Sequence, residues 1–127
     1  MWHNQKFMSE PTRTVLIVDD EPQILRLVEK MIGPRRARVL LAPKPSEALK
    51  ICEQQTVDVL ISDMAMPEMD GLKLADRVLK LHPNAHVLLI SGQYKEPAVV
   101  ARSERIRFLK KPFFPSELIA TLEEMLA

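Results

Sequence analysis

Four short apolar runs in this sequence end in residues that can bind a metal ion or react. Asp19 and Asp20 follow VLIV, Asp63 follows VDVLIS, Ser91 ends HVLLIS, and Lys111 follows RFLK. Clustered carboxylates repel one another unless a cation neutralises them, and a few hard oxygen ligands suit Mg²⁺. A carboxylate can also attack a phosphoryl group, whose charge a metal, an ammonium and a hydroxyl would stabilise. If the fold brings them together, these residues indicate phosphoryl transfer to an aspartate.

Each of these residues also has an ordinary structural explanation. Aspartate is a frequent helix N-cap, so Asp19 and Asp20 could simply begin a helix. Asp63 precedes a loop that contains proline and could be a turn residue. A serine at a strand end, such as Ser91, is usually structural, and a lysine pair is usually solvated. The argument for a site is the joint pattern, because independent structural causes seldom place all of these groups at one edge.

Alternating strands and helices must position these residues. Apolar, β-branched runs predict strands at residues 15–18, 38–42, 57–62, 86–91 and 107–109. Helical spacing predicts helices at residues 22–33, 46–55, 71–81, 95–103 (a weak pattern) and 116–126. The buried stripe of the first helix is predicted to consist of Ile24, Leu27, Val28 and Met31. Strands that alternate with helices form a parallel α/β sheet with helices on both faces, whose carboxyl ends share one edge.

Composition and charge are those of a globular domain. The chain has 127 residues, of which 46% are apolar and 28% charged, enough to bury a core. Eighteen Lys+Arg against 17 Asp+Glu give a net charge of +1, so no overall field attracts nucleic acid or anionic lipid. A single cysteine, Cys52, excludes an internal disulfide and a thiolate metal site. We expect a cytoplasmic domain.

The domain limits follow from where the alternating apolar and amphipathic pattern begins, at Thr14. Residues 1–13 lack the apolar region of a signal peptide and are interpreted as an N-terminal extension or tag remnant. Residues 14–127 are predicted to form the single domain. No apolar run approaches the roughly 20 residues that span a bilayer, so no membrane segment is expected.

The motifs around the polar residues resemble the receiver domain of two-component response regulators, of the single-domain chemotaxis type. VLIVDDE resembles the first strand and acidic pair of the family, and DMAMPEMDG its phosphoacceptor loop. LLISG resembles the fourth strand, and FLKKPF the Lys-Pro signature. The four motifs occur in the family's order over about residues 13–127. The resemblance implies a doubly wound, flavodoxin-like, three-layer α/β/α fold with five parallel strands in the order 2-1-3-4-5.

The resemblance also implies roles for the acidic residues. Asp63 would accept a phosphoryl group from a histidine kinase or histidine phosphotransfer protein. The phosphorylated state would then change binding to a downstream protein target. Asp20, Asp63 and the backbone carbonyl of Met64 would bind Mg²⁺ directly, and Asp19 would act through water.

Three further residues receive roles from the resemblance. Lys111 would pair with the phosphoryl oxygens, and its bond to Pro112 would be cis. Ser91 would donate its hydroxyl to the phosphoryl group. Phe108 would be an aromatic switch, with simple core packing as an equally good explanation. The domain would assist its own phosphotransfer and dephosphorylation without being a conventional enzyme, and no nucleic-acid binding is expected through it.

The segment between Ser91 and Lys111 departs from the family pattern. It contains Pro97 and no glycine after Gly92, so a short or displaced fourth helix is expected. This departure motivates a second interpretation, an interaction module that is never phosphorylated. A third interpretation is an aspartate-nucleophile phosphatase of the haloacid dehalogenase type. It is weakened by Ala65, which stands where that class has a second aspartate.

Overall fold

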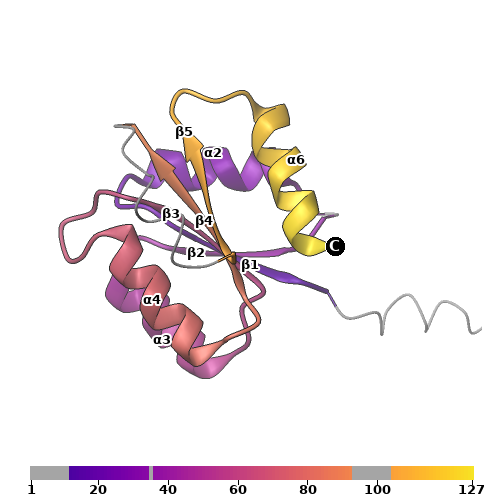
Figure 1. Ribbon diagram of the computed structural model, residues 1–127. Coiled ribbons are helices and arrows are strands. Elements are labelled where there is room, and N and C mark those ends of the chain that lie inside the picture. Colours follow the sequence, from indigo (N-terminus) through magenta and orange to yellow (C-terminus); the bar gives the residue numbers. More distant parts are fainter. Residues whose placement is uncertain (1–11, 35, 93–103) are drawn as a thin grey trace, which may run out of the picture.

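A five-stranded parallel sheet lies between two layers of helices (Figure 1). The computed structural model describes residues 12–34, 36–92 and 104–127. The strands are β1 (Thr14–Val18), β2 (Arg38–Ala42), β3 (Val59–Asp63), β4 (His86–Ser91) and β5 (Ile106–Lys110). The helices are α2 (Pro22–Ile32), α3 (Pro45–Gln54), α4 (Gly71–Leu81) and α6 (Pro115–Leu126). The strand order β2-β1-β3-β4-β5 confirms the predicted doubly wound, three-layer fold.

The central strands are buried on both faces, as continuous apolar runs predict for parallel sheets. All five residues of β1 are buried, and so are the first four of β3. Alternate residues therefore enter two separate cores. In β1, for example, Val15 and Ile17 belong to one core and Leu16 and Val18 to the other.

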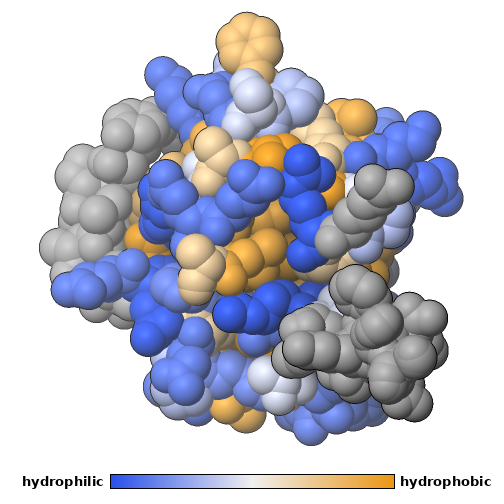
Figure 2. Space-filling model, turned by 90° about the vertical axis from the view of Figure 1, so that its right-hand side faces the viewer, coloured by the Kyte–Doolittle hydropathy of each residue, from blue (hydrophilic) through white to orange (hydrophobic). Residues whose placement is uncertain are grey.

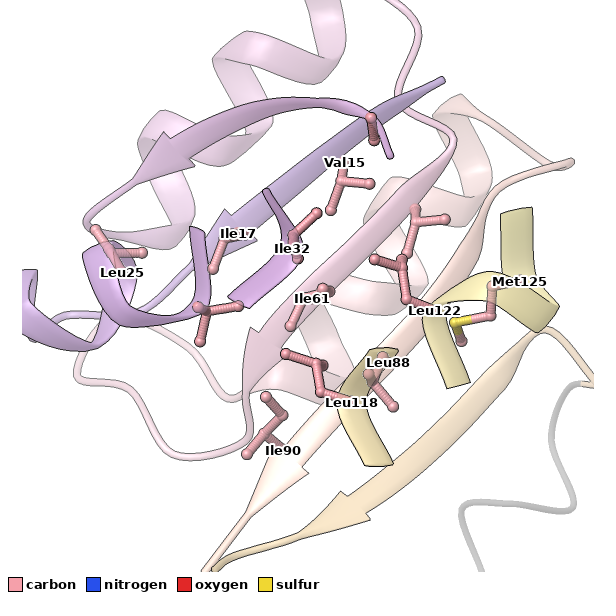
Figure 3. Packing of buried hydrophobic residues seen from close by; sticks show 13 residues of the cluster. Val15, Ile17, Leu25, Ile32, Ile61, Leu88, Ile90, Leu118, Leu122 and Met125 are labelled. Carbon is pink, nitrogen blue, oxygen red and sulfur yellow. The ribbon is translucent and has the colours of Figure 1, made fainter. Parts of the chain in front are cut away.

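The two cores lie on opposite faces of the sheet. We call the face covered by α2 and α6 the open face, and the face covered by α3 and α4 the closed face. On the open face, Leu25, Val28 and Ile32 of α2 and Leu118 and Leu122 of α6 pack over the strands (Figure 3). The closed face is formed by a second set of buried residues that includes Ala48, Cys52, Leu74, Ala75 and Val78.

Leu27 is a correction to the predicted stripe of α2. The residues buried along α2 are Leu25, Val28 and Ile32, whereas the Leu27 residue is 48% exposed. The helix starts at Pro22 and turns the i, i+3, i+7 series that begins at Leu25 toward the sheet. Leu27 therefore lies beside the buried series of α2 and is half exposed.

The third strand also differs from its prediction. It begins at Val59, two residues later than expected, and includes Asp63 as its last residue. Before it, the Asp58 side chain accepts a hydrogen bond from the Thr14 backbone N–H at 2.7 Å. The predicted helix at residues 95–103 and most of the predicted extension at residues 1–13 lie outside the described residues. Within the described residues, no helix is long and apolar enough to cross a membrane.

Candidate functional site

The carboxyl edge of the sheet gathers the three predicted aspartates. Asp63 ends β3, and Asp19 and Asp20 directly follow the neighbouring strand β1. The register that pairs Val18 with Ser62 places the two strand ends side by side. Each aspartate offers a carboxylate oxygen within 4.8 Å of those of the other two. Residues that are more than 40 positions apart in the printed sequence thus form one acidic cluster.

Asp19 is the buried member of the cluster. Its residue is only 5% exposed, and one carboxylate oxygen accepts a hydrogen bond from the Glu21 N–H at 2.9 Å. Burial raises the pKa of Asp19, while the bond from Glu21 lowers it and the nearby Asp63 carboxylate raises it again. A carboxylate in this position is stabilised by a cation, which removes both the desolvation and the repulsion.

Lys111 supplies a positive charge beside the cluster. Its ammonium lies 3.6 Å from Asp63 Oδ1, with the Lys111 side chain 39% exposed and that of Asp63 15% exposed. The Lys111 N–H donates to the Ser91 carbonyl at 2.8 Å, which ties the end of β5 to the end of β4. The peptide bond between Lys111 and Pro112 is cis, as predicted.

The loop between β3 and α4 approaches the first residue of α4 closely. The Met64 N–H donates to the Ile90 carbonyl at 2.9 Å, and the Gly71 N–H donates to the Met64 carbonyl at 2.7 Å. A Cβ atom on Gly71 would lie 2.5 Å from the Asp63 carbonyl oxygen. The Met64 carbonyl, the predicted backbone ligand, is therefore turned toward α4 and is already hydrogen-bonded.

Ser91 and Phe108 occupy different parts of this region. Ser91 is partly exposed at the end of β4, beside the strand that carries Asp63. Phe108 pairs in register with Leu89 and packs, partly buried, against the core of the closed face. This packing agrees with the structural explanation of Phe108; its role as a switch stays a prediction.

The donor set of the cluster fits a divalent cation that prefers oxygen. Three carboxylates converge, one of them buried, and an ammonium at 3.6 Å balances only part of their charge. Mg²⁺ takes a small number of carboxylate oxygens and keeps several waters, which suits a cluster with one exposed side. Asp20, which is exposed, and Asp63 would hold the ion, and Asp19 would orient its water.

An apolar cleft on the open face leads to the same cluster. It has a volume of about 510 Å³ and extends from Asp63 and Lys111 along α2. Its apolar lining residues include Ile17, Ile24, Leu27, Met31, Ile61, Ile90 and Phe113. Figure 2 views the molecule from the side where β1 begins and α6 ends, away from the acidic cluster, and there too hydrophobic atoms are visible between charged side chains. The sequence did not predict this cleft. Its helical pattern assigned Leu27 to the core, whereas Leu27 lines the cleft and is half exposed.

Comparisons with known proteins agree with the fold. The sequence matches the family model of the response regulator receiver domain over residues 15–123. The chain therefore belongs to the receiver domain family of two-component signal transduction. Receiver domains are regulatory rather than conventional enzymes, so the phosphatase interpretation is set aside.

Three relatives differ in how much of their own length this chain covers. An uncharacterized 14.6 kDa protein of Leptolyngbya boryana is 35% identical over 114 residues, which cover 87% of each chain. The transcriptional regulatory protein GlrR of Escherichia coli K12 is 30% identical over 94% of this chain, which spans only 27% of GlrR. The receiver domain of an HD domain-containing protein from Pseudomonas fluorescens Pf-5 superposes with a TM-score of 0.83 at 27% identity, covering 91% of this chain and 95% of that chain.

Proposed function

We propose that Asp63 is the phosphoacceptor of a two-component phosphorelay and receives its phosphoryl group from a histidine kinase or histidine phosphotransfer protein. The observation that carries this proposal is the convergence of Asp19, Asp20 and Asp63 within 4.8 Å, with the Lys111 ammonium 3.6 Å from Asp63. Asp63 is the member of the cluster that lies beside both the other carboxylates and the lysine.

The proposed reaction is an in-line displacement at phosphorus. A carboxylate oxygen of Asp63 attacks, the P–N bond of phosphohistidine breaks, and the imidazole leaves with the bonding electron pair and takes up a proton. The product is an acyl phosphate on Asp63. Lys111 would stabilise the phosphoryl oxygens, and the Ser91 hydroxyl would donate to them. Mg²⁺, when bound, would neutralise the charge shared by the carboxylates and the phosphoryl group.

The backbone ligand for Mg²⁺ is assigned to the loop that follows Asp63. Sequence reasoning placed it at Met64, whose carbonyl accepts a bond from Gly71 at 2.7 Å. The next carbonyl belongs to Ala65, an exposed residue of the same loop. We therefore prefer Ala65 to Met64 as the source of the backbone oxygen, because its carbonyl has no such bond to α4 in this structure.

The phosphodonor is proposed to dock on the open face. A histidine side chain reaches Asp63 only when the protein that carries it contacts the rim of the cluster. The apolar cleft beside Asp63, the half-exposed Leu27 and the 74% exposed Phe114 offer such a partner hydrophobic surface. Phosphorylation would then alter affinity for a downstream target by shifting a conformational equilibrium.

Binding of Mg²⁺ and beryllofluoride, observed by ¹H–¹⁵N NMR, tests whether the cluster works as this site. Mg²⁺ should shift the amide signals of Asp20, Asp63 and Met64, and beryllofluoride should add shifts at Ser91 and Lys111. Asp63→Asn should abolish the beryllofluoride shifts. A folded wild-type protein that responds to neither reagent would favour an interaction module that is not phosphorylated.

A further inference from the structure

Glu68, in the loop after β3, binds the amino end of α3. The Ser46 backbone N–H donates to Glu68 Oε1 at 3.0 Å, and the Ser46 hydroxyl donates to Glu68 Oε2 at 3.3 Å. The two residues are 22 positions apart in the sequence. Both carboxylate oxygens of one side chain thus join the phosphoacceptor loop to a different helix.

The amino end of α3 has no capping bond from its own N-cap side chain. Its N-cap residue, Lys44, makes no side-chain capping bond, and Pro45 has no N–H to donate. The Ser46 N–H is therefore the first free donor of the helix, and an anion beside it is favoured by the helix dipole. Glu68 satisfies this donor from outside the helix.

The loop that contains Glu68 has polar anchors at its two ends. They are the backbone bonds of Met64 and Gly71 and the Asp70 carboxylate, which caps α4 by accepting from the Lys73 N–H at 2.8 Å. In its middle, the Ser62 hydroxyl approaches the Met66 sulfur at 4.0 Å, which is a weak contact. The two bonds from Glu68 to Ser46 therefore join the outer part of the loop to α3.

The same helix end is linked to the buried aspartate. The Asp19 N–H donates to the carbonyl of Ala42 at 3.3 Å, and Ala42 ends β2 directly before the turn that enters α3. Two contacts therefore connect the loop after Asp63 to the backbone of Asp19. Glu68 binds Ser46 at the start of α3, and Ala42, just before α3, binds the Asp19 N–H.

We infer that Glu68 is a positioning residue for the acidic cluster. By holding the loop against α3, it would fix the Ala65 carbonyl, the preferred backbone oxygen, where that oxygen would complete the Mg²⁺ ligands. Glu68 does not itself touch the ion. The inference rests on the proposed function, because it concerns the metal that the cluster would bind.

Mg²⁺ titration of purified variants tests this role. Glu68→Ala removes both bonds and is expected to weaken Mg²⁺ binding by about three- to tenfold, no more than the lower limit of the roughly 10- to 100-fold that residues in direct contact with metal ligands contribute. Glu68→Gln should stay close to wild type, because its amide oxygen still accepts from the Ser46 N–H. Glu47→Gln is the matched control, since Glu47 is an exposed glutamate in the first turn of the same helix.

A thermal melt of each variant and a double mutant separate positioning from stability. Ser46→Ala and Glu68→Ala combined should weaken Mg²⁺ binding no more than Glu68→Ala alone, because both act on one bridge.

Two results would overturn the inference. In the first, Glu68→Ala lowers only the melting temperature. In the second, Glu68→Gln weakens Mg²⁺ binding as much as Glu68→Ala, which would indicate a through-space charge effect. If Glu68→Ala does not fold, Glu68→Asp, which keeps the charge but shortens the side chain by one carbon, must weaken binding on its own, and wild-type affinity there contradicts the inference. A wild-type protein that binds no Mg²⁺ overturns the proposed function as well. If the wild type binds Mg²⁺ and only the expected differences between the Glu68 variants are missing, the proposed function stands.

Discussion

The two faces of this sheet are built for different tasks. On the closed face, Leu74 and Val78 of α4 are fully buried, and Glu68 binds the first turn of α3 from the loop after Asp63. On the open face, an apolar cleft of about 510 Å³ runs from Asp63 to the half-exposed Leu27. The comparison shows that the site at this sheet edge has a tightly packed helical layer on one side and an apolar cleft on the other.

Truncation of one leucine on each face should give the largest contrast. Leu74→Ala leaves a cavity in a fully buried core and is expected to lower the free energy of unfolding by about 2–5 kcal/mol. Leu27→Ala removes a side chain that is half in water and should change it by less than about 0.5 kcal/mol. Urea denaturation measures both. A similar loss for the two variants would show that the open face is packed as tightly as the closed face.

Gly71 tests how firmly the closed face holds the loop. Gly71→Ala places a Cβ 2.5 Å from the Asp63 carbonyl oxygen, a backbone atom, so the loop must move. We expect a loss of about 1–3 kcal/mol in unfolding free energy, together with slower phosphorylation by acetyl phosphate. Gly92→Ala is the control, because its Cβ would lie 3.9 Å from Lys111 Cδ, an ordinary contact. Equal behaviour of the two variants would contradict the close approach at Gly71.

Leu27→Lys tests whether the open face receives the phosphodonor. A charge in the cleft should slow transfer from a phosphorylated histidine phosphotransfer protein by about tenfold, which corresponds to about 1.4 kcal/mol. Transfer from acetyl phosphate, which needs no protein contact, should keep its wild-type rate. Equal slowing with both donors would place the defect in the cluster itself and remove the argument for docking at Leu27.

His86, at the opposite edge of the sheet, should give the smallest effect. Burial lowers the pKa of His86, and Arg105, Arg107 and Arg13 lower it further. The unfolded chain therefore binds a proton more readily than the folded one, so stability should fall as the pH drops through the ordinary histidine value of 6.5. His86→Gln should flatten the thermal stability between about pH 7.5 and 5.5, where histidine titrates. A wild-type melting temperature that rises on acidification would contradict the sign.

The sequence predicted the fold well because its periodic signals are local. The apolar run of β1 and the helical spacing of α4 each carry enough information to define their element. The convergence of Asp19 and Asp63 was also predictable, because parallel strands end at one edge. The exposure of Leu27 was not, since helical periodicity does not say which of two adjacent apolar stripes meets the sheet.

Contacts between a loop and a helix end could not be predicted from the sequence for a different reason. The bridge from Glu68 to Ser46 joins a loop to the first turn of α3, and their approach depends on how α3 and α4 pack. The bond from Gly71 to the Met64 carbonyl likewise depends on the angle at which the chain enters α4. Neither contact follows from residue spacing, and both changed the assignment of roles around Asp63.

Intact-protein mass spectrometry after incubation with acetyl phosphate and Mg²⁺ tests the central claim most directly. The wild-type protein should gain the mass of one phosphoryl group, and neither Asp63→Asn nor a sample treated with EDTA should gain any. Asp58→Asn is a control outside the cluster, because Asp58 binds the Thr14 N–H instead, and it should be phosphorylated like the wild type. A phosphoryl group that also appears on folded Asp63→Asn would contradict the assignment of Asp63, and its absence from all folded samples would contradict phosphoryl transfer itself.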